Sequence, residues 1–273
     1  MALLKVLLLL GLGVSVNSDV SLQKRIIGGH DCNNNERLYH VRITANGHFV
    51  CGGSLIHPEW ILTAAHCWLQ GRTMAAMLRV HPRGQRNPQQ DDQIIQPNQN
   101  YRVVYTDNGQ QHDIMLMRLQ RPVTNVNPVP LPDCRNRPQK GDSVELAGEG
   151  AMTTGSFYGT LKTFISGKMK SSPMYERVTN APIPPHLQCV DMTVDDCSSC
   201  LQNYEGHNRR FCVQEAGKDS SPGDSGGGVT FKGKIYGVIA GSNNHYACAI
   251  SAFIMDVCEY IDWIRQTTGL VKT

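Results

Sequence analysis

The sequence predicts an all-β fold, a sandwich or a barrel, that ends in one amphipathic α-helix. Short β-branched and apolar runs alternate with turn residues along most of the chain, which contains 26 glycines and 14 prolines. Helical periodicity is sustained only from Val257, after which apolar residues recur at Tyr260, Ile261 and Ile264. Gly269 follows this stretch and is the expected stop signal of the helix.

The predicted strands include, in chain order, His48–Val50, Trp60–Thr63, Ile114–Leu119, Ser143–Ala147 and Lys234–Ala240. Turn residues lie between these runs, a spacing typical of all-β domains. Residues 83–100 are rich in glutamine, asparagine and proline, so we expect a surface loop there. This stretch lacks the carboxylate cluster that a calcium loop would need.

The first 18 residues have the pattern of a secretory signal peptide. Lys5 precedes the apolar run Val6–Leu10, and small or polar residues follow through Ser18. The run is shorter than the roughly 20 residues that a membrane anchor needs, and no later segment qualifies as a span. We therefore expect a secreted, extracellular protein, on a route that also permits storage in secretory granules. Most of its ten cysteines are then expected in disulfides.

The charge balance does not indicate nucleic-acid binding. The formal net charge is +3 over 273 residues. Neither a basic run nor an interleaving of basic and aromatic residues accompanies it. A chain of this length can bury a sizeable core in one large or two small domains.

Three short motifs supply candidate catalytic residues in the order His, Asp, Ser. They are Leu62–Cys67 with His66, His112–Leu119 with Asp113, and Gly223–Gly227 with Ser225. A serine hydroxyl needs an adjacent base, and imidazole can accept and return a proton near neutral pH. We expect Ser225 as nucleophile, His66 as general base and acid, and Asp113 as the carboxylate that orients the imidazole. The backbone N–H groups of Gly223 and Ser225 are expected to form an oxyanion hole.

The chain resembles the chymotrypsin-like serine proteases, and trypsin most closely, from Ile26 to about Ile264. Besides the three motifs, the segments that carry the resemblance are Ile26–Gly29, Cys51–Ile56, Phe211–Ser220 and Val257–Ile264. The resemblance implies two six-stranded antiparallel β-barrels with a C-terminal α-helix and a catalytic cleft between the barrels. It also implies a peptide-bond hydrolase without cofactor or metal. Its partners would be protein or peptide substrates, an activating protease and proteinaceous inhibitors.

The signal-peptide pattern and the resemblance together divide the chain into three parts. Residues 1–18 would be the signal peptide, 19–25 an activation propeptide and 26–273 the protease domain. The dibasic pair before Ile26 resembles an activation junction that is cut after Arg25. The freed α-ammonium of Ile26 is then expected to fold inward and pair with Asp224.

Substrate preference is expected to depend on Asp219, six residues before Ser225. Trypsin-like relatives hold an acidic residue at this spacing, at the base of the primary specificity pocket. A carboxylate there favours arginine or lysine before the cut bond. Gly241 and Ser242 are the other expected substrate-binding residues.

Other positions near the expected cleft depart from the family pattern. Ala240 and Gly241 replace a serine and a tryptophan, and Glu149 stands where a second tryptophan is common. These changes leave open a second hypothesis, a catalytically weak homologue that acts as a binding protein.

The resemblance implies three disulfides: Cys51–Cys67, Cys189–Cys212 and Cys134–Cys258. The remaining cysteines can pair in three ways; they are Cys32, Cys197, Cys200 and Cys248. A zinc site is the alternative for Cys189, Cys197, Cys200 and Cys212. Secretion favours oxidation over zinc binding, and the segment has no other metal-site signature.

Overall fold

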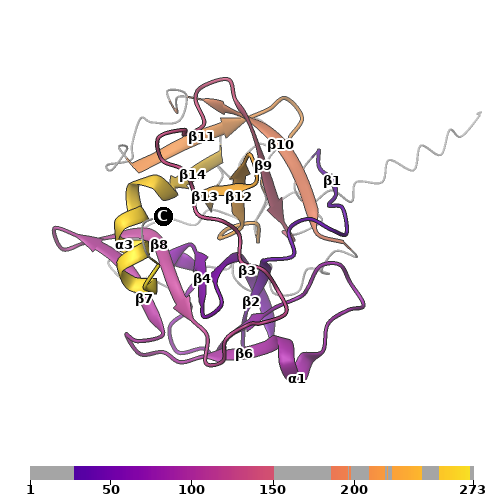
Figure 1. Cartoon of the computed structure of the whole chain (residues 1–273), viewed down its shortest axis with the longest axis vertical. Coiled ribbons are helices and arrows are strands. Elements are labelled where there is room, and N and C mark those ends of the chain that lie inside the picture. Colours follow the sequence, from indigo (N-terminus) through magenta and orange to yellow (C-terminus); the bar gives the residue numbers. More distant parts are fainter. Residues whose placement is uncertain are drawn as a thin grey trace, which may run out of the picture.

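The computed structural model describes residues 28–150, 186–195, 197, 209–218, 220, 223–241 and 252–270. In this part of the chain, two antiparallel sheets of seven strands each form the two halves of the molecule (Figure 1). The strand order is β6-β5-β2-β3-β4-β8-β7 in the first sheet, in the lower half of Figure 1. It is β1-β10-β11-β14-β13-β12-β9 in the second sheet, in the upper half.

The first sheet contains β2 (His40–Ala45), β3 (His48–His57), β4 (Trp60–Thr63), β5 (Met74–Met77), β6 (Asp92–Ile95), β7 (Arg102–Asp107) and β8 (Gln110–Arg118). Asn46-Gly47 joins β2 to β3, and Asn108-Gly109 joins β7 to β8; all four residues have positive φ. Asn-Gly is the pair favoured in tight hairpin turns of this kind. The hairpins direct Ile43, Leu55 and other apolar side chains into a core without solvent exposure.

The second sheet contains β1 (His30–Asp31), β9 (Ser143–Gly148), β10 (Gln188–Asp195), β11 (Arg210–Gln214), β12 (Gly228–Phe231), β13 (Lys234–Gly241) and β14 (Ala252–Asp256). Strand β9 pairs with both β12 and β10, so six strands close into a barrel and β1 adds to it outside. The predicted trypsin-like β-fold is confirmed. The first sheet differs from the predicted barrel because, among the described residues, no ladder joins its two edge strands.

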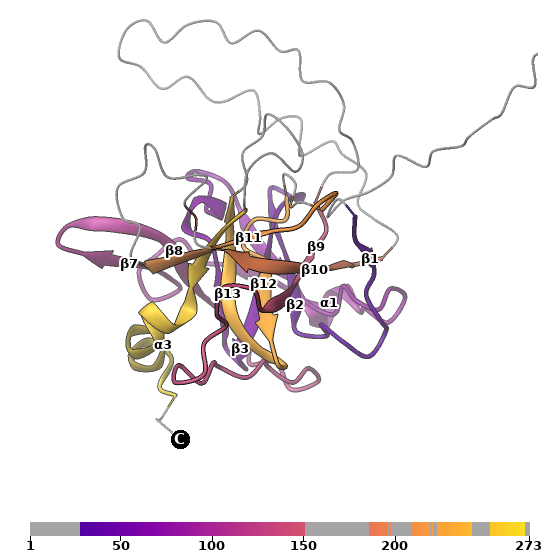
Figure 2. The same ribbon diagram turned by 90° about the horizontal axis from the view of Figure 1, so that it is seen from above.

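The chain ends in the predicted helix. A 3₁₀ turn, η3 (Val257–Tyr260), leads into α3 (Ile261–Thr268), and Gly269 stops the helix in the left-handed conformation at φ 75°. Trp263 on α3 packs edge-on against Tyr105 on β7, at 5.4 Å between ring centroids. The helix thus lies beside the β7–β8 hairpin in both views (Figure 2). No helix in the described ranges is long and apolar enough to cross a membrane.

The prediction of a loop at residues 83–100 is partly wrong. This stretch contains α1 (Pro88–Asp91) and the strand β6. The side chain of Asn87 accepts a hydrogen bond from the N–H of Gln89, and Pro88 occupies the first helical turn, where its missing N–H costs nothing. The following residues pair with β5, which gives their backbone groups partners.

Four disulfides join described residues, and one predicted pairing is wrong. Cys51–Cys67 and Cys134–Cys258 form as expected. Cys189, however, bonds Cys32, and Cys212 bonds Cys197. Cys200 and Cys248 lie outside the described residues.

The register of β10 explains the correction. Cys212 on β11 lies opposite Asp195, at the far end of β10 from Cys189. Six residues of extended strand span roughly 20 Å, far beyond the reach of a disulfide. β1 instead pairs with the start of β10 and brings Cys32 within 5.0 Å of Cys189, measured between Cα atoms.

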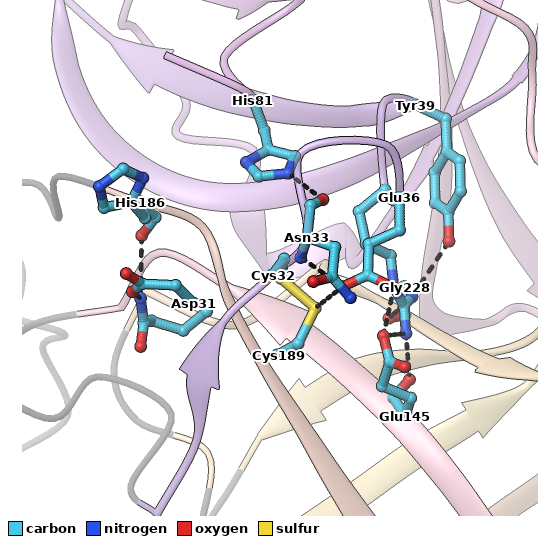
Figure 3. The surroundings of a disulfide bond; sticks show 12 residues. Asp31, Cys32, Asn33, Glu36, Tyr39, His81, Glu145, His186, Cys189 and Gly228 are labelled. Atoms are coloured by element: carbon cyan, nitrogen blue, oxygen red, sulfur yellow. Dashed lines mark hydrogen bonds and ion pairs between the residues drawn. A yellow bond between two sulfur atoms is a disulfide. The ribbon is translucent and has the colours of Figure 1, made fainter.

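Polar contacts fix the segment around the Cys32–Cys189 bond (Figure 3). The backbone N–H of Asn33 donates to Glu36, and its carbonyl oxygen lies 2.9 Å from Nε2 of His81. The guanidinium of Arg37 donates to the Glu145 carboxylate at 2.6 and 2.8 Å. Because Glu145 is on β9, this segment joins the two halves of the molecule.

Candidate active site

His66 and Asp113 lie in direct contact. His66 is on the 3₁₀ turn η1 (Ala65–Cys67), just after β4, and Asp113 is on β8, which pairs with β4. The Nδ1 atom of His66 lies 2.8 Å from Oδ2 of Asp113, and the backbone N–H of His66 donates to Oδ1 at 2.9 Å. The Nδ1 contact orients the ring and the backbone bond fixes the residue, so Nε2, which lies 3.9 Å from Sγ of Cys67, is the nitrogen that can exchange a proton with another group.

The surroundings keep Asp113 charged and His66 accessible. The side chain of Asp113 is 25% exposed and that of His66 is 44% exposed. Burial raises the pKa of Asp113, but hydrogen bonds and charge from His66 outweigh it and lower the pKa below its ordinary value. Asp113 is therefore ionised at neutral pH and can stabilise an imidazolium beside it.

Ser225 lies on the turn that precedes β12, at the boundary between the sheets. Its carbonyl oxygen accepts a hydrogen bond from the N–H of Gly52 on β3 at 2.9 Å. The N–H of Gly226 donates to a carbonyl on β13 at 2.7 Å. A Cβ atom on Gly226 would lie 3.3 Å from Sγ of Cys67, the neighbour of His66. The Ser225 turn thus packs against the segment that bears His66.

Two glycines allow this close packing. Gly226 has φ 80°, and a Cβ atom there would overlap Oγ1 of Thr63. Gly223 has φ 102°, and its Cβ atom would lie 2.9 Å from the Phe49 ring and 3.0 Å from Cα of Gly150. Residues with side chains rarely adopt positive φ, so only glycine meets both requirements here.

Asp224, between these glycines, is fully buried. The N–H of Gly150 donates to its Oδ1 atom at 2.8 Å. Ile26, its expected partner, lies outside the described residues.

A buried polar cluster of His40, Arg42 and Glu149 lies beside this turn and was not predicted from the sequence. Glu149, expected near the cleft, has a side chain only 1% exposed and forms a bidentate pair with Arg42. His40 lies 3.8 Å away, measured from its Nε2 atom to Oε2 of Glu149. Arg42 lies on β2, which is buried along its whole length, and a buried cation needs an anionic partner. The partner is 107 residues away and cannot be identified from local pattern.

The expected specificity residues are only partly described. Gly241 ends β13, and among the described residues no atom lies within 4 Å of the place where its Cβ would be. Ala240 packs against the core of the first sheet. Asp219 and Ser242 lie outside the described residues.

The cysteines of the site are not arranged as metal ligands. Cys51, His66 and Cys67 bring ligand-type atoms together, as do Cys32, Glu36 and Cys189. In both groups the two sulfurs form a disulfide, which removes the thiolates that a metal would need. The zinc alternative also loses Cys197 and Cys212, which bond each other.

Comparisons with known proteins agree with this geometry. The family model for Trypsin matches residues 26–183 and 174–264. Cationic trypsin-3 of Rattus norvegicus is 32% identical over 259 residues, which cover 90% of either chain. Snake venom serine protease Haly-2 of Gloydius brevicauda is 32% identical, over 88% of this chain and 86% of its own. Snake venom serine protease catroxase-1 of Crotalus atrox is also 32% identical, over 88% and 85%.

The fold, the His–Asp pair and the adjoining serine turn thus define the class of this protein, a serine endopeptidase. Within that class the chain belongs to the trypsin family.

Proposed function

We propose that the protein is a secreted zymogen that, once activated, hydrolyses peptide bonds after arginine or lysine through Ser225, His66 and Asp113. The observation that carries the proposal is the 2.8 Å contact between His66 and Asp113, beside which the Ser225 turn packs. In this assignment 1–18 is the signal peptide, 19–25 the propeptide and 26–273 the protease domain.

The proposed mechanism begins with proton transfer. His66 Nε2 takes the proton of the Ser225 hydroxyl as Oγ attacks the substrate carbonyl carbon. The N–H groups of Gly223 and Ser225 stabilise the negative oxygen that forms. His66 then returns the proton to the leaving amine, which departs from an acyl-enzyme. Water attacks the acyl carbon as His66 takes one of its protons; His66 then gives that proton to Ser225 Oγ as the C–Oγ bond breaks, which releases the acid product and restores Ser225.

Activation is proposed to follow cleavage after Arg25 by another protease. The new α-ammonium of Ile26 would pair with Asp224, whose carboxylate is buried beside the Ser225 turn. A buried carboxylate gains strongly from a cationic partner, so the pairing would order the oxyanion hole. An Arg25→Gln precursor is expected to remain uncut and inactive. Full activity of that uncut precursor would contradict the mechanism.

The direct test of catalysis is Ser225→Ala in the activated protein. Turnover of a peptide substrate should fall by several orders of magnitude, while circular dichroism and the melting temperature stay close to those of the parent. Turnover near the parent rate would rule out Ser225 as the nucleophile.

Specificity is tested on matched peptides that end in Arg, Lys, Phe, Leu or Ala before the cut bond. Arg and Lys should be preferred, with Arg first if its guanidinium binds Asp219 in bidentate fashion. Asp219→Ser should abolish the preference. A preference for an uncharged residue in the parent would contradict this specificity, as would an unchanged profile in the variant. Proteinaceous serine protease inhibitors are expected to bind in the same cleft.

A further inference from the structure

We propose that Glu149, paired with Arg42 and flanked by His40, is a positioning residue for the turn that contains Ser225. The inference rests on the proposed function, which makes Ser225 the nucleophile and Gly223 an oxyanion donor. Glu149 is not proposed to touch substrate. It acts through the backbone of its own segment.

The three side chains of the cluster are buried, and two hydrogen bonds fix Arg42 against Glu149. Arg42 Nε lies 2.8 Å from Oε2 of Glu149, and Nη2 lies 2.5 Å from Oε1. Arg42 is 8% exposed, and His40 and Glu149 are each 2% exposed. Burial disfavours a charged carboxylate, yet His40 and Arg42 lower the pKa of Glu149 to about 2. Arg83, an exposed residue after β5, adds a further cation nearby.

One route from the cluster to the turn passes through Gly150. Glu149 and Gly150 directly follow β9, so the ion pair fixes the end of that strand to β2. The N–H of Gly150 donates to Asp224, and its Cα atom lies close to Gly223. A shift of Glu149 would therefore move a residue that contacts both Asp224 and the proposed oxyanion donor.

A second route passes through Gly52. A Cβ atom on Gly52 would lie 3.1 Å from Cε1 of His40 and 3.2 Å from Cα of Gly227. The N–H of Gly52 holds the carbonyl oxygen of Ser225. The cluster thus reaches the turn from β2 and β3 as well as from the end of β9.

Charge compensation strengthens the argument. A Cβ atom on Gly148 would overlap the carboxylate of Asp224, so two buried carboxylates lie against the same short backbone segment. Arg42 neutralises Glu149 within the cluster. Without that cation, Glu149 would have to move, bind a proton or compete for the α-ammonium of Ile26, the proposed partner of Asp224.

The chain contains a matched control. Glu145 lies four residues earlier on β9 and pairs with Arg37, so a second Arg–Glu pair joins the same two halves. Arg37 is 5% exposed, comparable to Arg42. Glu145, however, has a side chain that is 31% exposed, pairs in register with Thr230 and Asp191, and makes no described contact of its own with the 223–227 turn. Arg37 donates to the carbonyl oxygen of Gly228, just after that turn, at 3.4 Å, so the control variant is Glu145→Gln, which keeps Arg37. Loss of either pair should destabilise the fold, but only loss of Glu149 should affect catalysis.

The experiment compares Glu149→Gln with Glu145→Gln in the activated protein. We expect Glu149→Gln to lower kcat by roughly 10- to 100-fold with little change in KM, because small displacements of catalytic groups have effects of this size. A peptide aldehyde, which adds to Ser225 and places an oxyanion, should bind more weakly by a similar factor. The matching peptide alcohol should bind unchanged. Glu145→Gln should keep parent kcat and aldehyde affinity.

Each outcome decides the matter. Equal kcat values in Glu149→Gln and the parent would overturn the inference, and so would equal losses in both variants. If Glu149→Gln does not fold, Arg42→Lys carries the test against Glu145→Gln, because lysine keeps the charge but loses the bidentate fork. Ser225→Ala, measured in parallel, separates a failure of the proposed function from a failure of the positioning role. An active Ser225→Ala overturns the proposed function, whereas an inactive one beside an unaffected Glu149→Gln overturns only the positioning role.

Discussion

At the scale of single residues, the contact between His66 and Asp113, which we propose as two members of the catalytic triad, predicts the effect of a small change. Asp113→Asn keeps the size of the side chain but presents an amide N–H group, which favours the wrong imidazole tautomer. We expect kcat to fall by about 10⁴-fold, with the fold intact. Steady-state kinetics on one peptide substrate measures the loss. A decrease of less than tenfold would show that Asp113 does not orient His66.

The lowered pKa of Glu149 predicts how the unfolding free energy depends on pH. Its pKa is about 2 in the folded protein and 4.5 ordinarily, so its stabilising contribution is complete above about pH 4.5. The contribution is lost as the pH falls from there toward 2. Between pH 6 and pH 3 the parent should therefore lose about 2 kcal/mol more unfolding free energy than Glu149→Gln. Urea unfolding at the two pH values measures the difference. Parallel losses would contradict an ionised, paired Glu149.

At the scale of elements, the continuous segment formed by η3 and α3 is attached to the first sheet by aromatic and polar contacts. The hydroxyl of Tyr260 lies 2.9 Å from Nδ1 of His112, the residue before Asp113. The guanidinium of Arg209 lies over the rings of Tyr105 and Tyr260, at 5.3 and 5.8 Å from their centroids. The end of the chain therefore supports the strand that carries Asp113.

Tyr260→Phe tests this attachment. The ring would still fill the buried site, but Nδ1 of His112 would lose its partner. We expect a loss of about 1 kcal/mol in unfolding free energy, typical for one buried hydrogen bond. Chemical denaturation measures it. Tyr260→Leu, which also removes the ring contacts, should cost clearly more, and equal losses would show that the hydrogen bond is irrelevant.

At the scale of the whole molecule, the disulfides differ in the length of chain that they close. Cys134–Cys258 joins residues 124 positions apart, whereas Cys197–Cys212 joins residues 15 apart. Loss of chain entropy in the unfolded state grows with this length. Replacing the first pair by serines should thus cost about 2 kcal/mol more than replacing the second. Urea unfolding of the two double variants makes the comparison. The reverse order would show that local packing dominates.

Much of this architecture is predictable from the sequence because its causes are local. Trp60–Thr63 and the end of α3 at Gly269 follow from short apolar runs and a glycine stop, and the structure has both at the expected places. The predicted pairing of Cys189 with Cys212 is wrong because the true partner depends on strand register, which places β1 beside β10. The Arg42–Glu149 pair was missed for a similar reason, since only tertiary packing brings the two residues together.

The two long-range disulfides have one more consequence. Cys32–Cys189 and Cys134–Cys258 both connect residues before position 151 with residues after position 185. A single cut of the peptide backbone between those positions would therefore release no fragment. The nicked protein would migrate as one species on a denaturing gel without reductant and as two after reduction. Proteolytic damage in that interval would go unnoticed in any purity assay that omits the reductant.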